Sequence, residues 1–145
     1  MNDILKINIK EKSFDKRILF FNLNLSLPRK GLVALIGQSG CGKSTLLNMI
    51  SGVDQDYNGS IHFENINIKK LKRNKLKDYR INNIGYVFQN FSLINDETAF
   101  DNVMLPLSCS SLLVKRIKTR RINDAFELLH ISELKNKIVA NLSGG

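Results

Sequence analysis

The sequence predicts an α/β fold with a parallel sheet at its core and a helical part towards the C-terminus. Three observations predict it. Residues 32–36 (LVALI) form an apolar run without alternation, which is typical of a strand buried on both faces of a parallel sheet. A glycine-rich segment and a helical pattern follow directly, and residues 84–88 (IGYVF) again have the character of a buried strand. After Gln89 the pattern is mainly helical.

The remaining elements follow from local periodicity. Residues 4–9 and 18–27 alternate between apolar and polar side chains and are expected to be strands, and residues 60–68 indicate a hairpin. Helices are expected over 43–51 and near 115–130. Their apolar faces are predicted to hold Leu46, Leu47 and Ile50 in the first helix and Ala125, Phe126, Leu128 and Leu129 in the second.

Composition limits the class of protein. The chain has 145 residues, of which 43% are hydrophobic, and this is enough for the core of one globular chain. Its apolar runs are far shorter than the roughly 20 residues that cross a bilayer, and its first residues lack a signal-peptide core. We therefore expect a cytoplasmic protein. The net charge of +9 favours anionic partners such as nucleotides, nucleic acid or acidic lipids, although a solvated lysine-rich surface explains it equally well.

One motif carries chemistry. Residues 37–45 (GQSGCGKST) match the pattern G-x-x-x-x-G-K-[ST], which cradles the phosphates of a nucleotide. Glycines let the backbone turn its N–H groups inwards, and the following helix adds the positive end of its dipole. Lys43 is expected to reach the β- and γ-phosphates, Ser44 to ligate Mg²⁺, and Thr45 to assist on the α-phosphate side. The predicted nucleotide-binding residues of this loop are Gly37, Ser39, Gly40, Cys41, Gly42, Lys43, Ser44 and Thr45.

The loop alone does not choose between ATP and GTP. A GTPase needs a guanine-reading N-K-x-D, and residues 74–77 (NKLK) lack its aspartate. Three further segments resemble the ATP-binding subunits of ABC transporters. These are residues 86–89 (YVFQ), which resemble the strand that ends in the Q-loop glutamine, residues 142–145 (LSGG), which match the signature, and Phe14, at the place of the aromatic residue that stacks on adenine. The segment 91–107 is similar to the macrolide-export and lipoprotein-release branch, which implies an exporter.

The resemblance implies a P-loop NTPase fold of the ABC type. It has a parallel sheet, an N-terminal antiparallel β portion and a helical subdomain, with an α/β core over 1–89 and the helical subdomain over 90–145. It also implies ATP and Mg²⁺ as cofactors, with Lys43 and Gln89 in catalysis and Ser44 and Gln89 at the metal. Ser143, Gly144 and Gly145 are then expected to hold the γ-phosphate of ATP bound to a second copy, in a head-to-tail dimer. The further partner is a transmembrane permease at the cytoplasmic face of the membrane, and nucleic acid is not expected.

The chain departs from the family pattern after the signature, because no Walker B strand, catalytic glutamate or switch histidine follows Gly145. We therefore expect a truncated form that hydrolyses ATP slowly and leaves the apolar faces of 32–36 and 84–88 partly bare. Two alternatives remain open. One is a non-transport ABC ATPase in cell division, translation or DNA repair, whose basic run 69–80 binds nucleic acid or membrane, although a solvated face is the simpler interpretation of that run. The other is an inactive fragment.

Overall fold

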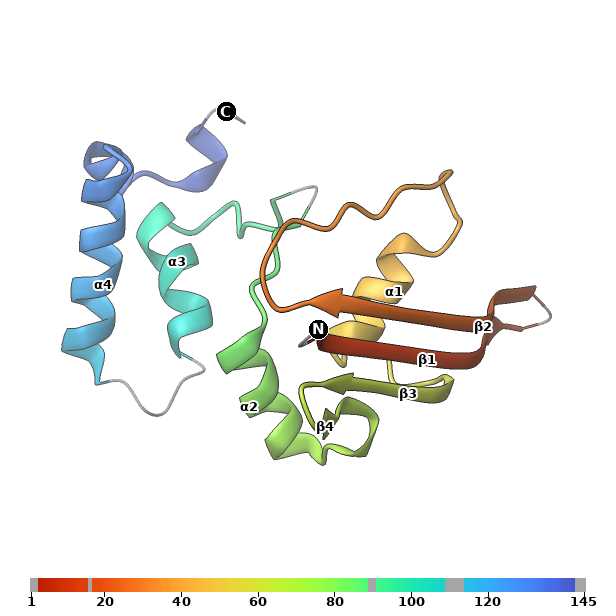
Figure 1. Cartoon of the computed structure of the whole chain (residues 1–145). Coiled ribbons are helices and arrows are strands. Elements are labelled where there is room, and N and C mark those ends of the chain that lie inside the picture. The colour runs from red at the N-terminus through yellow and green to blue at the C-terminus, as the bar shows by residue number, and fades with distance from the viewer. Residues whose placement is uncertain (1–2, 16, 89–90, 109–113, 143–145) are drawn as a thin grey trace. The chain divides into compact units, whose positions relative to one another are not determined.

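Four antiparallel strands form a sheet in the N-terminal part of the computed structural model, which describes residues 3–15, 17–88, 91–108 and 114–142. The chain divides into two units, Met1–Ile84 and Gly85–Gly145. In the first unit the strands lie in the order β2-β1-β3-β4 (Figure 1). Their bounds are Asp3–Phe14 for β1, Arg17–Pro28 for β2, Asn58–Phe63 for β3 and Ile66–Asn67 for β4. The strands predicted over 4–9 and 18–27 and the hairpin predicted over 60–68 are thus confirmed.

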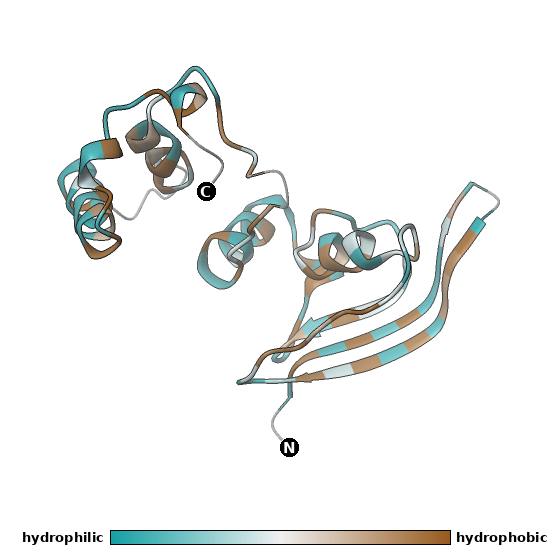
Figure 2. Ribbon diagram, turned by 90° about the horizontal axis from the view of Figure 1, so that it is seen from above, coloured by the Kyte–Doolittle hydropathy of each residue, from teal (hydrophilic) through white to brown (hydrophobic). Residues whose placement is uncertain are grey.

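The sheet has one apolar and one polar face, as alternating strands require. Leu5, Ile7 and Ile9 of β1 are buried, whereas the residues between them are exposed. Ile7 pairs with Leu25 on one side and with Ile61 on the other, so that apolar side chains line up across three strands. The alternation is visible as stripes along the strands in Figure 2.

Helix α1 (Lys43–Ile50) packs its apolar side against this face and confirms the helix predicted over 43–51. Leu46 and Met49 are its buried residues, so the predicted face was wrong in one member, because Leu47 is exposed. The 3₁₀ turn η1 (Ile68–Lys70) and helix α2 (Arg73–Asn83) complete the core. The core of this unit consists of Leu5, Ile7, Ile9, Leu46, Met49, Tyr57, Ile61, Ile68, Leu76 and Tyr79.

Helix α2 contains most of the basic run and caps the C-terminal end of α1. Tyr79 donates a hydrogen bond from its hydroxyl to the carbonyl oxygen of Ile50 at 3.0 Å, and Arg80 donates to the carbonyl oxygen of Gly52 at 3.3 Å. The first donor satisfies a carbonyl group that the end of α1 leaves without an intrahelical partner, and the second binds the turn that follows the helix. The apolar side of α2 is therefore buried while most of its lysines and arginines face solvent.

Two predicted strands are absent, which corrects the expected parallel sheet. Residues 32–36 and 84–88 have no regular secondary structure in the described part of the chain. Leu32, Ile36 and Val87 are 99%, 90% and 95% exposed. A strand forms only where a second backbone pairs with it, and neither segment pairs with another strand among the described residues. The strands predicted at 32–36 and 84–88 are therefore wrong for the described chain, whereas the expected exposure of these segments is observed.

The second unit is helical in its described residues. It contains α3 (Ala99–Ser108), α4 (Lys115–Leu128) and the 3₁₀ turns η2 (Ser132–Leu134) and η3 (Val139–Asn141). Helix α4 confirms the helix predicted near 115–130, but its buried residues are Ile122 and Phe126, one turn apart. The predicted face was therefore wrong for Ala125, Leu128 and Leu129, which are exposed. Within the described residues, no helix is both long and apolar enough to span a membrane.

Candidate nucleotide-binding loop

The glycine-rich loop leads directly into α1. The backbone N–H of Cys41 donates to the carbonyl oxygen of Gln38 at 3.3 Å, which closes a turn just before the helix. Gly42 occupies the N-cap position with φ of 102°, and no side chain caps the helix there. The first N–H groups of α1 have no intrahelical acceptor and carry the positive end of the helix dipole. The N-terminus of α1 is therefore suited to bind an anion.

Side chains of β2 pack beside Gly42 of the loop, and their closeness favours a glycine there. A Cβ atom at Gly42 would lie 2.7 Å from Cζ of Phe20, closer than real Cβ atoms approach, and in a tight contact of 3.0 Å with Cδ2 of Leu19. Its left-handed backbone also disfavours any residue with a side chain. Packing and backbone conformation therefore both favour glycine at this position.

The ammonium group of Lys43 lies against the loop itself. Its Nζ donates to the carbonyl oxygen of Gly37 at 2.7 Å and to that of Gln38 at 2.8 Å, and it lies 3.8 Å from Sγ of Cys41. The next two residues, Ser44 and Thr45, occupy the first turn of α1, where Ser44 is exposed and Thr45 half-buried. A cation, two hydroxyl groups and the free helix amides thus come from one short segment. This donor set matches the oxygen atoms of a polyphosphate and fits the predicted phosphate site.

The other predicted site residues are distributed as follows. Phe14 ends β1 and is 52% exposed, as an aromatic shelf requires. Gln89, Ser143, Gly144 and Gly145 lie outside the described residues, so their predicted roles stay predictions.

Sequence reasoning missed a buried cation beside Phe14. The Nζ atom of Lys12 lies 4.5 Å from the centroid of the Phe14 ring and 2.9 Å from a carboxylate oxygen of Asp54. The strand pattern buries odd-numbered residues up to Ile9, and an irregularity between Ile9 and Glu11 then changes the phase. Lys12 consequently points inwards, which simple alternation along the sequence does not reveal.

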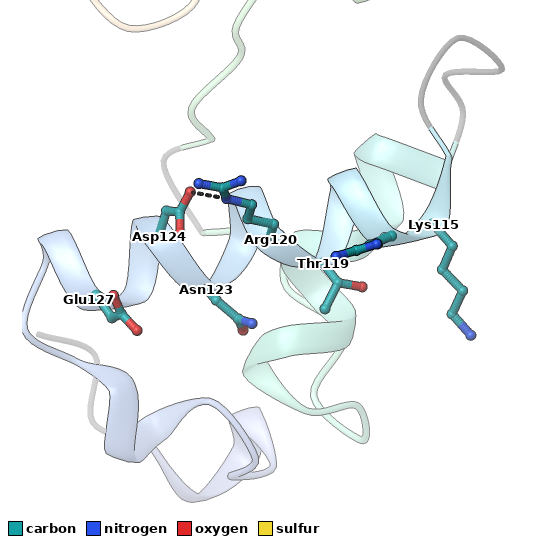
Figure 3. A pocket seen from close by; sticks show the side chains of 7 residues that line it. Lys115, Thr119, Arg120, Asn123, Asp124 and Glu127 are labelled. Carbon is teal, nitrogen blue, oxygen red and sulfur yellow. Dashed lines mark ion pairs between the residues drawn. The ribbon is translucent and has the colours of Figure 1, made fainter.

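A second feature, on α4, has different chemistry. An open hollow along this helix is bordered by mixed charges (Figure 3). Arg120 and Asp124 pair across one turn of the helix at 3.8 Å. The lining residues are Lys115, Arg116, Thr119, Arg120, Asn123, Asp124 and Glu127. An exposed pair of this kind contributes little to stability or binding, and all of the lining residues come from one helix. The phosphate loop is therefore the better candidate site.

A known protein family and several known proteins are similar to this chain over most of its length. The family model described as ABC transporter matches residues 20–145. Methionine import ATP-binding protein MetN of Clostridioides difficile is 35% identical over 142 residues, which cover 98% of this chain and 44% of that protein. An uncharacterised ABC transporter ATP-binding protein of Mycobacterium tuberculosis is 39% identical over 123 residues, which cover 85% of this chain and 37% of the relative. The chain thus spans less than half the length of these relatives.

Solved structures are similar over nearly the whole chain. The dimeric ATP-binding cassette MJ0796 in a post-hydrolysis state, bound to ADP and Pi, matches 97% of this chain and 63% of its own, with a TM-score of 0.79 and 29% identity. CbiO1 of Clostridium perfringens, part of an ABC transporter complex, matches 99% of this chain and 57% of its own with a TM-score of 0.79 and 25% identity. These matches confirm the predicted P-loop NTPase fold class of the ABC type, although residues 32–36 and 84–88 form no strands in the described part of this chain.

Proposed function

Because this chain belongs to the ABC transporter family, we propose that it binds Mg-ATP through the loop at residues 37–45. The observation that carries the proposal is the position of Lys43. Its ammonium group lies within hydrogen-bonding distance of the loop carbonyls, at the start of a helix whose N-cap is a glycine. A triphosphate placed at this helix end replaces those carbonyl contacts with stronger charge-assisted ones.

In this proposal each residue of the site contacts a different part of the nucleotide. Lys43 neutralises the β- and γ-phosphates, and the amides at the start of α1 donate to phosphate oxygens. The Ser44 hydroxyl ligates Mg²⁺, which suits a hard cation that prefers oxygen ligands. Thr45 donates on the α-phosphate side, and Phe14 stacks on adenine. Gln89 contributes to the metal or the attacking water in this proposal.

We further propose that the chain acts as the ATPase subunit of a transporter. In the family dimer, Ser143, Gly144 and Gly145 of one copy would face the nucleotide of the other, and a permease would hold the dimer at the cytoplasmic face of the membrane. The structural relative MJ0796 is described as dimeric, which supports a dimer. Export is not supported, because several of the relatives are methionine import proteins.

Nucleotide titration of the 145-residue chain and its Lys43→Ala variant tests the proposal. We expect the variant to bind ATP about tenfold to a hundredfold more weakly, since a hydrogen bond to a charged group contributes about 1.5–3 kcal/mol. Lys75→Ala is the matched control, because it removes the same charge from an exposed position on α2. Calorimetry with ATP and Mg²⁺ measures all three affinities.

The control separates site binding from general charge attraction. If Lys75→Ala weakens binding as much as Lys43→Ala does, the nucleotide is attracted by the net charge and the loop assignment is wrong. If the unaltered chain and both variants bind ATP with equal affinity, the assignment of the loop as the nucleotide site is also wrong.

A further inference from the structure

Lys12 is the one charged side chain that is buried among the described residues, with 2% of it exposed. A buried ammonium group is unfavourable unless partners compensate its lost hydration. The partners of Lys12 therefore indicate what holds it in place.

Three of its contacts reach the segment that follows α1. Nζ lies 2.9 Å and 3.2 Å from the two carboxylate oxygens of Asp54 and donates to the backbone carbonyl of Asp56 at 2.5 Å. The carboxylate of Asp56 lies 3.7 Å away and is fully at the surface. Asp54 is itself fixed, because its backbone N–H donates to the carbonyl oxygen of Asn48 in α1 at 3.1 Å. Lys12 thus joins β1 to the end of the helix that begins at the phosphate loop.

The fourth contact is with an aromatic ring. Nζ lies 4.5 Å from the centroid of Phe14, within the range of a cation–π interaction. A cation over one face of the ring restricts its rotation, while half of the side chain stays exposed. The ring is consequently held with surface available for stacking.

Lys12 is also connected to the phosphate loop through β2. In the β1–β2 ladder Lys12 pairs with Phe20, and the Phe20 ring occupies the space beside Gly42. The same two strands therefore support the aromatic ring and the start of α1. A displacement of the Lys12 side chain therefore affects the orientation of the Phe14 ring directly, and it affects the loop only through the backbone of β1 and β2.

We propose that Lys12 is a positioning residue for the nucleobase: held by Asp54 and Asp56, its ammonium group orients the Phe14 ring and draws electron density towards itself, so that the outer surface of the ring stacks more strongly on an electron-rich purine. This proposal rests on the proposed binding of ATP. Ordering the ring before binding also lowers the entropy that stacking costs. Lys12 then affects recognition of the base and leaves recognition of the phosphates unchanged.

Two ligands separate base from phosphate recognition. Calorimetry with ATP and with inorganic tripolyphosphate, each with Mg²⁺, is carried out on the 145-residue chain and on its Lys12→Met, Lys12→Arg and Phe14→Ala variants. We expect Lys12→Met to weaken ATP binding about threefold to tenfold, as the loss of a cation–π contact predicts, and to leave tripolyphosphate binding unchanged. Lys12→Arg keeps the charge and restores most of the ATP affinity. The double variant Lys12→Met/Phe14→Ala is expected to bind ATP no more weakly than Phe14→Ala, because Lys12 acts through the ring.

The outcomes distinguish the two hypotheses. If the unaltered chain binds neither ligand, the proposed function itself is wrong. If Lys12→Met weakens both ligands equally, or neither, Lys12 has a purely structural role or none, and the positioning proposal is overturned. Because Lys12→Met leaves Asp54 without its cation, Lys12→Met/Asp54→Asn removes both charges and keeps the test valid should the single variant unfold. It is expected to show the same selective loss of ATP binding.

Discussion

At the scale of single residues, two tyrosines in the core of the first unit have the same burial and different partners. Tyr57 and Tyr79 are both 4% exposed. Burial raises the pKa of each to about 12, and the charge of Asp54 adds to the effect at Tyr57, so both phenols are neutral at physiological pH. The hydroxyl of Tyr79 donates to Ile50, whereas that of Tyr57 has no hydrogen-bond partner among the described residues. The two hydroxyl groups are therefore expected to contribute differently to the free energy of unfolding.

Replacing each of these tyrosines with phenylalanine tests that difference. Tyr79→Phe is expected to lower the free energy of unfolding by about 0.5–1.5 kcal/mol, because the Ile50 carbonyl loses its donor. Tyr57→Phe is expected to be neutral or slightly stabilising, since it removes a buried hydroxyl that makes no bond. Urea denaturation of the two variants, each the control for the other, measures this. A larger loss for Tyr57→Phe would show that its hydroxyl has a partner.

At the same scale, the residues of the candidate site that could be predicted from the sequence are those that follow one another along the chain. The loop at 37–45 was found from sequence because its proposed phosphate donors, adjacent amides and Lys43, all lie on one short stretch. Phe20 and Lys12 were not found. Their roles depend on strand pairing and on a change of phase in β1, and these are fixed by residues far away in the sequence.

At the scale of elements, the contact between β1 and β3 depends on Gly59. This residue has φ of 132°, and a Cβ atom there would lie 2.2 Å from the backbone oxygen of Asn8. A backbone atom cannot move aside as a side chain can, so the two strands approach closely only with glycine at this point.

Gly59→Ala is therefore expected to destabilise the first unit by more than 3 kcal/mol, since about 1–3 kcal/mol of backbone strain adds to the clash. Gly31→Ala is the matched control, because Gly31 has φ of 126° and no atom within 4 Å of its Cβ position. The control should show the strain alone. Thermal or urea unfolding compares the two variants, and equal losses would mean that β3 shifts without cost.

Elements with a local signal were predictable and those that need a partner were not. Helices α1 and α4 and strands β1 and β2 follow from periodicity within each segment. The apolar runs at 32–36 and 84–88 have strand-like composition, but hydrogen bonds to another strand decide whether they become strands. Local patterns also cannot place a register irregularity such as the one in β1.

At the scale of the whole molecule, exposed apolar segments coexist with a net charge of +9. Charge of one sign keeps molecules apart, whereas exposed apolar surface brings them together. Salt screens the first effect and leaves the second. Self-association of this chain should therefore increase as the ionic strength rises.

The double variant Leu32→Glu/Val87→Glu is expected to reduce that association strongly, because both side chains are almost fully exposed. Asn65→Glu/Asn82→Glu is the control, since it lowers the net charge equally at exposed polar positions. Light scattering against salt concentration measures association, and far-ultraviolet circular dichroism checks the fold. If both pairs act alike, charge rather than apolar contact controls association.

The turn at Gly42 has a consequence for how this protein can change over time. In the proposed site the phosphates are bound mainly by main-chain amides, which every residue type except proline possesses, so most substitutions at positions such as Gln38 or Ser39 keep these donors. At Gly42 the opposite holds, because a residue with a side chain is strained at φ of 102° and its Cβ atom requires the Phe20 ring to shift. We therefore expect substitutions to accumulate at positions such as Gln38 and Ser39, and glycine to be retained at position 42, where the loop meets β2.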